Sequence, residues 1–161
     1  MNRRYASATA VSPDRSRTEI EHTLQRYGAD QFAYGWNEGG AMIGFRFKRW
    51  LVRFQLPLPS EEDAMRTPKG RTRRKHLAAK AKDQEIRRRW RSLALAIKAK
   101  LDTVETGITT FETEFLPYIM LPNGQTAGEW LAPQLEKLYD KGEMPRGLLM
   151  LPAPKKTAEV A

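Results

Sequence analysis

A stripe of apolar residues recurs at helical spacing through the middle of the chain. Eight successive steps of three or four residues cover 29 positions, a mean of about 3.6, which is the period of an α-helix. The stripe predicts one long helix or two nearly collinear helices, and Gly107 is the position where a break or kink is expected. Its members are Ile86, Trp90, Leu93, Ile97, Leu101, Val104, Ile108, Phe111 and Phe115.

Upstream of the stripe the pattern changes to alternation, which is typical of half-buried strands. Large apolar residues occupy every second position over 32–36, 43–47 and 50–56. If Lys48 and Arg49 form the tip of a tight hairpin, Phe47 pairs with Trp50 and all these residues share one face. A slightly longer loop is the alternative, because Lys-Arg is an unusual hairpin tip.

Capping signals mark a helix on either side of these elements. Ser16 and Glu19 have the spacing of a capping box, and the helix that they would open stops at Gly28. Thr126 and Glu129 repeat the pattern before a last helix that ends near Gly142. This last helix is expected to direct its apolar residues inward and to close over the sheet: Trp130, Leu131, Leu135 and Leu138.

The expected fold class is therefore α+β. An N-terminal helix and a three-stranded antiparallel meander precede a long amphipathic helix and a shorter C-terminal helix. Residues 1–15 are expected to form a flexible arm, residues 16–145 a single domain with a basic linker at 60–76, and residues 146–161 a tail.

Positive charge is concentrated in residues 69–101. Thirteen Lys or Arg stand there against Asp83 and Glu85, a net +11, whereas the whole chain carries +9. Such localisation favours a polyanionic partner over a general adaptation for solubility. The candidate contact residues lie in the arm, on the helix and at the hairpin tip: Arg71, Arg73, Arg74, Lys75, Lys80, Arg87, Arg88, Arg91, Lys98, Lys48 and Arg49.

The aromatic residues of the strands admit two interpretations. Exposed Phe, Tyr and Trp stack on the bases of single strands in many binding proteins. Here they all fall on the face that must form the core, so packing is the favoured interpretation. Tyr34 and Trp36 are the residues expected to be partly exposed.

Catalytic signatures are absent from the sequence. It contains no cysteine and only two histidines, which argues against thiol chemistry and His-rich metal sites. No phosphate-binding glycine loop or nucleophile motif occurs, and the carboxylates near the stripe are of the kind that is normally solvated. We therefore expect a protein that is not an enzyme, with no cofactor, no metal and no small-molecule substrate. No secretory signal or apolar span is evident, so a cytoplasmic protein without a membrane partner is expected.

Several short segments resemble a family of uncharacterised proteins carried by phages and prophages. They are Tyr27-Gly28-Ala29, the run from Val52 to Pro57, Trp90-Arg91 with Ile97 to Leu101, and Leu121 to Gly124 with Gly128 to Trp130. The resemblance covers about residues 16–145 and implies a mobile-element protein in a bacterial host cell. It implies no particular activity.

These observations favour a non-catalytic nucleic-acid-binding accessory protein of a mobile element, with DNA preferred over RNA as the partner. As an oligomer it would coat or anneal single strands. The alternative is a protein interaction module, either a homo-oligomer or an inhibitor or adaptor of a host or phage protein, that uses the long helix and the apolar tail.

Overall fold

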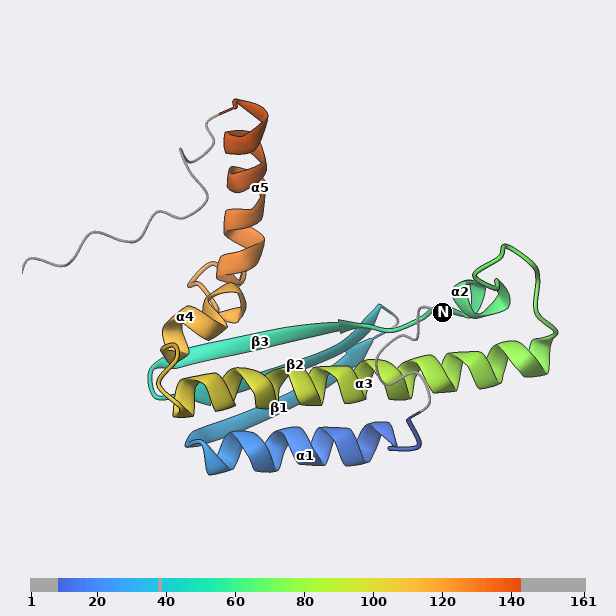
Figure 1. The fold of residues 1–161 in the computed structure, drawn as a ribbon, viewed down its shortest axis with the longest axis horizontal. Coiled ribbons are helices and arrows are strands. Elements are labelled where there is room, and N and C mark those ends of the chain that lie inside the picture. The colour runs from blue at the N-terminus through green and yellow to red at the C-terminus, as the bar shows by residue number, and fades with distance from the viewer. Residues whose placement is uncertain (1–8, 38, 143–161) are drawn as a thin grey trace, which may run out of the picture.

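The computed structural model describes residues 9–37 and 39–142. Helix α1 (Pro13–Arg26) precedes a three-stranded antiparallel sheet, in which β1 (Ala29–Asn37), β2 (Gly40–Phe47) and β3 (Trp50–Pro57) lie in chain order. Helices α2 (Glu61–Met65), α3 (Lys75–Glu105) and α4 (Phe111–Phe115), the 3-10 helix η1 (Leu116–Tyr118) and α5 (Ala127–Asp140) follow. Helices α1 and α3 cover one face of the sheet (Figure 1), which confirms the expected α+β fold. Most of the expected N-terminal arm and the whole of the expected tail at 146–161 lie outside the described residues.

The strand pairing follows the predicted register. Phe47 lies opposite Trp50 and Ile43 lies opposite Phe54, so Lys48 and Arg49 form a two-residue turn. Lys48 adopts a φ of 54°, a left-handed conformation that tight hairpin turns need and that residues other than glycine seldom adopt.

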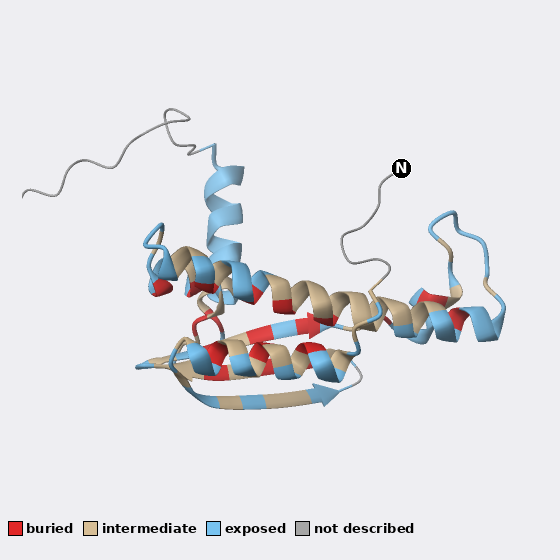
Figure 2. Ribbon diagram, turned by 60° about the horizontal axis from the view of Figure 1, so that its bottom comes forward, coloured by how far each residue is buried: buried red, intermediate tan, exposed pale blue. Residues whose placement is uncertain are grey.

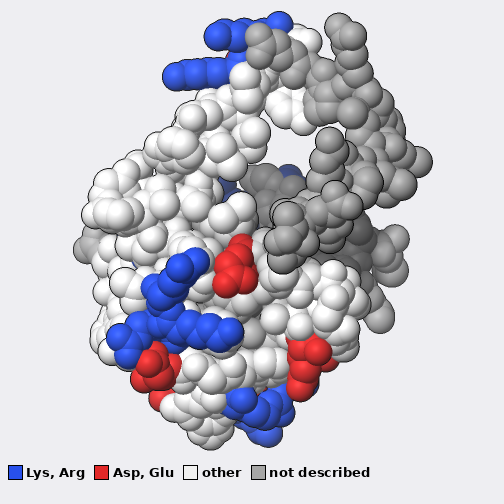
Figure 3. Space-filling view, turned by 90° about the vertical axis from the view of Figure 1, so that its left-hand side faces the viewer, with Lys and Arg blue, Asp and Glu red and all other residues white. Residues whose placement is uncertain are grey.

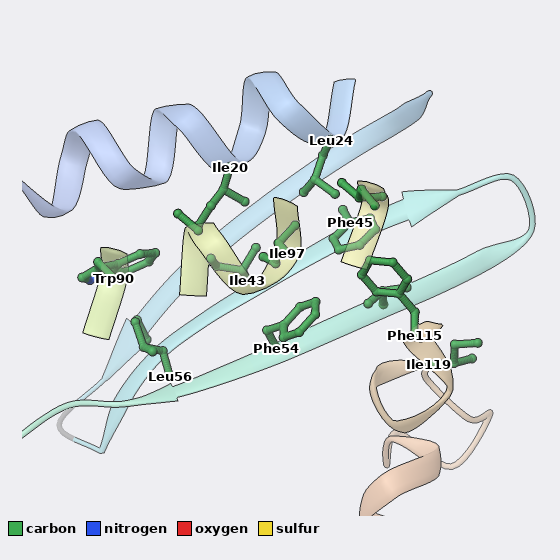
Figure 4. Packing of buried hydrophobic residues seen from close by; sticks show 14 of the residues in the cluster. Ile20, Leu24, Ile43, Phe45, Phe54, Leu56, Trp90, Ile97, Phe115 and Ile119 are labelled. Carbon is green, nitrogen blue, oxygen red and sulfur yellow. The ribbon is translucent and has the colours of Figure 1, made fainter. Parts of the chain in front are cut away.

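One hydrophobic core joins the inner face of the sheet to α1 and α3 (Figure 4). Ile43 of β2 and Ile97 of α3 are completely buried at its centre. Phe115 of α4 closes one end, where its ring meets Phe45 and Phe54 edge-on at 6.1 and 6.2 Å. The predicted stripe is thus the core-facing side of α3, continued by α4.

The stripe is interrupted at the expected glycine. Helix α3 ends at Glu105, and Gly107 has a φ of 75°, which is readily available only to glycine. Ile108 is consequently 77% exposed and is not a core residue. The chain re-enters the core at Phe111, so two separate helices carry the pattern.

The start of α1 corrects the sequence prediction. The N-cap is Ser12, whose hydroxyl accepts a hydrogen bond from the Arg15 amide at 3.2 Å. Pro13 follows at the first helical position, where its fixed φ suits a helix and its missing amide costs nothing. Ser16 is fully buried inside the helix, so the predicted capping box at Ser16 is wrong.

The segment expected to be a linker, 60–76, contains folded structure. A capping box between Ser60 and Asp63 opens α2. Beyond it the chain reverses direction: Arg66 forms an antiparallel bridge with Thr72, and the Arg73 guanidinium donates to the carbonyl groups of Ala64 and Arg66. Hydrogen bonds, rather than the apolar residues on which sequence patterns depend, stabilise this turn.

Helix α5 begins and ends as predicted, but it does not close over the sheet. The Thr126–Glu129 capping box is present and Gly142 follows the C-terminus with a φ of 71°. Trp130, Leu131 and the three other large apolar residues of the helix remain 38–57% exposed, and α5 is exposed along most of its length (Figure 2). The prediction that its apolar residues point inward is therefore wrong.

The base of α5 explains its direction. A Cβ on Gly128 would come within 2.7 Å of the Pro117 carbonyl oxygen, so the helix starts in tight contact with η1. Arg53, on the outer face of the sheet, donates to Glu129 at 2.8 Å and to the Gly124 carbonyl at 3.0 Å. These contacts hold the first turn of α5 at the β3 edge while the rest of the helix points away from the sheet (Figure 1).

Candidate nucleic-acid interface

The N-terminal part of α3 extends beyond the sheet and carries α2 and the adjoining turn at its end (Figure 1). Ala64 and Ala78 are buried where α2 and α3 meet, which secures this projection. Six exposed cations lie on it and form what we call the basic pole: Arg66, Lys69, Arg71, Arg74, Lys75 and Lys80. None of the six makes an ion pair with any residue in the described part of the chain.

The start of α3 is electrostatically unfavourable as it stands. A helix N-terminus carries partial positive charge and usually attracts acidic side chains. Helices α1, α2, α4 and α5 each have an acidic residue in the first turn, whereas α3 has none. Its N-cap is Arg74, which makes no capping hydrogen bond, and Lys75 follows. A polyanion bound here would relieve this repulsion.

Acidic residues of α2 lie close to these cations, but two of them already interact with other side chains. Asp63 accepts hydrogen bonds from the backbone and hydroxyl of Ser60, which lower the pKa of its carboxyl group. Glu61 lies 4.0 Å from Lys82, at the limit of an ion pair. Residues 60–82 still carry eight basic and three acidic groups, a net +5.

The three arginines that the sequence favoured on α3 are placed differently from one another. Arg88 donates two hydrogen bonds to Glu85, and Arg91 pairs with Glu19 of α1. Only Arg87 lacks an ion-pair partner in the part that the structure describes. Helix α3 thus uses much of its central positive charge to hold the fold together.

The remaining candidates lie outside the basic pole. Arg73 is turned inward onto backbone carbonyls. Lys98 is exposed about 27 Å along α3 from Lys80, as follows from the helical rise. Lys48 and Arg49 form the β2–β3 turn. The end of the molecule that Figure 3 shows carries both basic and acidic side chains. Their charges also lower the pKa of Glu112, although the hydrogen bond from the Trp50 indole is the larger cause.

A partly exposed aromatic pair lies at the same end of the sheet as the basic pole. Trp36 is 75% exposed and stacks on Tyr34 with ring centroids 5.8 Å apart, while the Arg17 guanidinium lies 4.5 Å from the Tyr34 ring. Trp36 is in register with Ala41 and Leu56, next to the point where β3 leads into α2. The expected exposure of these two aromatic residues is confirmed.

Two members of the basic pole were missed as site residues from the sequence. Arg66 precedes the densest run of positive charge, and only the turn brings it opposite Thr72. Lys69 lies within that run but is not among the contact residues that the sequence predicts. The pairing of Arg88 was readable, because Glu85 precedes it by three positions, a spacing that places both on one helix face. The pairing of Arg91 with Glu19 joins residues 72 positions apart, so no local spacing in the sequence indicates it.

Other kinds of site find little support among the described residues. No group of three His, Asp or Glu side chains there is arranged to hold a metal ion. Within the same residues, no helix combines the length and apolar character needed to cross a membrane. No protein-family model, curated protein or solved structure matches the chain.

Proposed function

We propose that this chain is a non-catalytic nucleic-acid-binding accessory protein of a mobile element, and that it contacts phosphates through the basic pole. The observation that carries the proposal is the cluster of six exposed cations near the N-terminus of α3, which form no ion pair with any described residue and adjoin a first helical turn without acidic residues. Phosphate contacts of this kind release counterions, so affinity falls steeply with salt and depends little on base sequence.

Trp36 favours a single strand as the nucleic acid. Stacking on an exposed aromatic side chain requires an unpaired base, and it contributes roughly 1–3 kcal/mol per base. A single strand that ran from the basic pole along the edge strand β1 would pass Trp36, which lies on β1. Phosphates would bind the pole while a base stacks on Trp36.

The test is binding of a labelled single-stranded oligonucleotide over a range of salt concentrations. The variant Arg71→Glu, Arg74→Glu, Lys75→Glu should abolish detectable binding at moderate salt. The matched control Lys48→Glu, Lys98→Glu, Arg49→Glu carries the same charge change outside the pole and should retain most of the affinity. Equal losses in the two variants, or no binding by the original protein at low salt, would contradict the proposal.

A second candidate function is a protein interaction module. The observation that favours it is α5, whose five large apolar residues are 38–57% exposed although the helix is amphipathic. Exposed apolar surface of this extent is characteristic of association sites. The two functions are compatible, because the basic pole and α5 lie at opposite ends of the molecule (Figure 1).

A further inference from the structure

The outer face of the sheet, on the side away from α1 and α3, is apolar in its centre. A shallow hollow of about 670 Å³ lies over the three strands. Gln31, Arg46 and Arg53 form its polar rim. Small or apolar residues form its floor and sides, which we call the sheet groove: Ala33, Gly35, Met42, Gly44, Leu51 and Met120.

Two glycines, Gly35 and Gly44, line the groove, although neither backbone conformation nor space requires glycine at these positions. Neither Gly35 nor Gly44 has a positive φ. A Cβ at Gly35 would meet nothing within 4 Å, and one at Gly44 would make only ordinary contacts, the nearest at 3.7 Å. Glycine inside a strand weakens the strand and often marks a place where another chain approaches closely. The groove therefore has room for another chain to approach the sheet closely.

Helix α5 of the same chain has the complementary surface. Leu131, Leu135, Leu138 and Tyr139 recur at helical spacing on one side of it, and all are 38–57% exposed. Its 14 residues span about 21 Å and the eight residues of β3 span about 26 Å, so the helix fits along the strands. It cannot cover its own groove, because Gly128 and Glu129 fix its base at the β3 edge.

We propose that two copies of this chain form a reciprocal dimer, in which α5 of each copy lies in the sheet groove of the other. A two-fold axis makes the two contacts identical, so the apolar face of α5 and the sheet groove are covered in both copies. Specific interfaces typically bury roughly 1,600 Å² in total, and in this arrangement two identical helix-on-sheet contacts share that area. The leucine side chains fill the space above Gly35 and Gly44, with Arg46 and Gln31 at the wet rim.

Sedimentation velocity over a concentration series tests the dimer, with three variants beside the original protein. Leu135→Asp with Leu138→Asp removes the helix side of the contact, and Gly35→Glu fills the groove where the fold leaves open space. Each should convert the dimer to a monomer with an unchanged circular dichroism spectrum. Gln25→Glu, which adds the same charge on α1, is the matched control and should remain dimeric.

Mixing the two monomeric variants distinguishes this arrangement from pairing of α5 with α5. The groove variant still has an intact α5, and the helix variant still has an intact groove, so the mixture should form a mixed dimer with one of the two contacts. Pairing through α5 alone predicts a dimeric Gly35→Glu variant and no rescue on mixing. Either of these results, or an original protein that is monomeric at every concentration, would overturn the proposal.

Discussion

Glu85 pairs with two arginines of the same helix, Arg88 and Arg89. It accepts hydrogen bonds from Arg88 and Arg89, and Arg89 also donates to the Pro57 carbonyl at the end of β3. These contacts, chiefly the one from Arg88, lower the pKa of Glu85 from 4.5 to about 2. Glu85 therefore links the helix surface to the sheet through a charge network.

The lowered pKa of Glu85 predicts the pH dependence of stability. Its ionised form stabilises the fold fully above the unfolded pKa near 4.5, and this contribution is lost as the pH falls toward the folded pKa near 2. With the side chain 23% exposed, solvent screening reduces the expected contribution to about 1–2 kcal/mol. Urea denaturation at several pH values measures it.

The control for this prediction is a pair of substitutions to glutamine. Glu85→Gln should lower the free energy of unfolding at neutral pH and flatten its fall between about pH 5 and pH 2. Glu136→Gln, on the exposed α5, should change neither. An unchanged pH profile in Glu85→Gln would show that the network contributes nothing.

Trp36 gives a second prediction for a single residue. Trp36→Ala should reduce affinity for a single-stranded oligonucleotide by about tenfold or more, because one stacked base is lost, while weak binding to duplex DNA stays the same. Fluorescence anisotropy with both ligands provides the measurement. Since the ring is 75% exposed, the fold should tolerate the change. Equal losses for both ligands would contradict base stacking at this position.

At the scale of a secondary-structure element, the start of α3 lacks both a side-chain cap and an acidic residue in its first turn. Arg74→Asp would place an acceptor at the N-cap and a negative charge at the positive end of the helix. It should stabilise the protein by about 1 kcal/mol and weaken binding to nucleic acid. Thermal denaturation and the binding assay on the same sample test both effects. A variant that is more stable and binds equally well would exclude the α3 N-terminus from the interface.

The elements themselves were predictable where their sequence pattern is local. The alternation of apolar residues identified the three strands and the register of β2 with β3, and the helical period identified α3 up to Gly107. The predicted start of α1 was wrong because Ser12 and Ser16 both precede a helical pattern. Ser12, which is followed by Pro13, is the N-cap. The direction of α5 was not predictable. An amphipathic pattern indicates that one face of a helix is covered, but it does not identify the surface that covers it.

The candidate site depended on contacts that the sequence does not encode locally. The concentration of positive charge placed the candidate interface within one region of the chain. Tertiary contacts determine which cations remain available to a ligand. Arg91 pairs with Glu19, whereas the turn at Arg66 leaves that side chain exposed. Charge counting alone could not separate the arginines that stabilise the fold from those that remain unpaired.

At the scale of the whole molecule, a reciprocal dimer would carry two basic poles. A strand long enough to reach both should then show about twice the salt dependence that the monomeric Gly35→Glu variant shows, because twice as many phosphates release counterions. Comparing the slopes of log affinity against log salt for the two proteins measures this ratio. Equal slopes on long strands would mean that the two poles bind independently.

The most direct test of the basic pole as the nucleic-acid interface is nuclear magnetic resonance of isotopically labelled protein titrated with a short single-stranded oligonucleotide. The amide resonances of Gly70, Arg71, Lys75 and Lys80 should shift most, together with the Trp36 indole, and the shifts should disappear at high salt. Shifts confined to Lys48 and Arg49 at the β2–β3 turn, or to α5, would contradict the account.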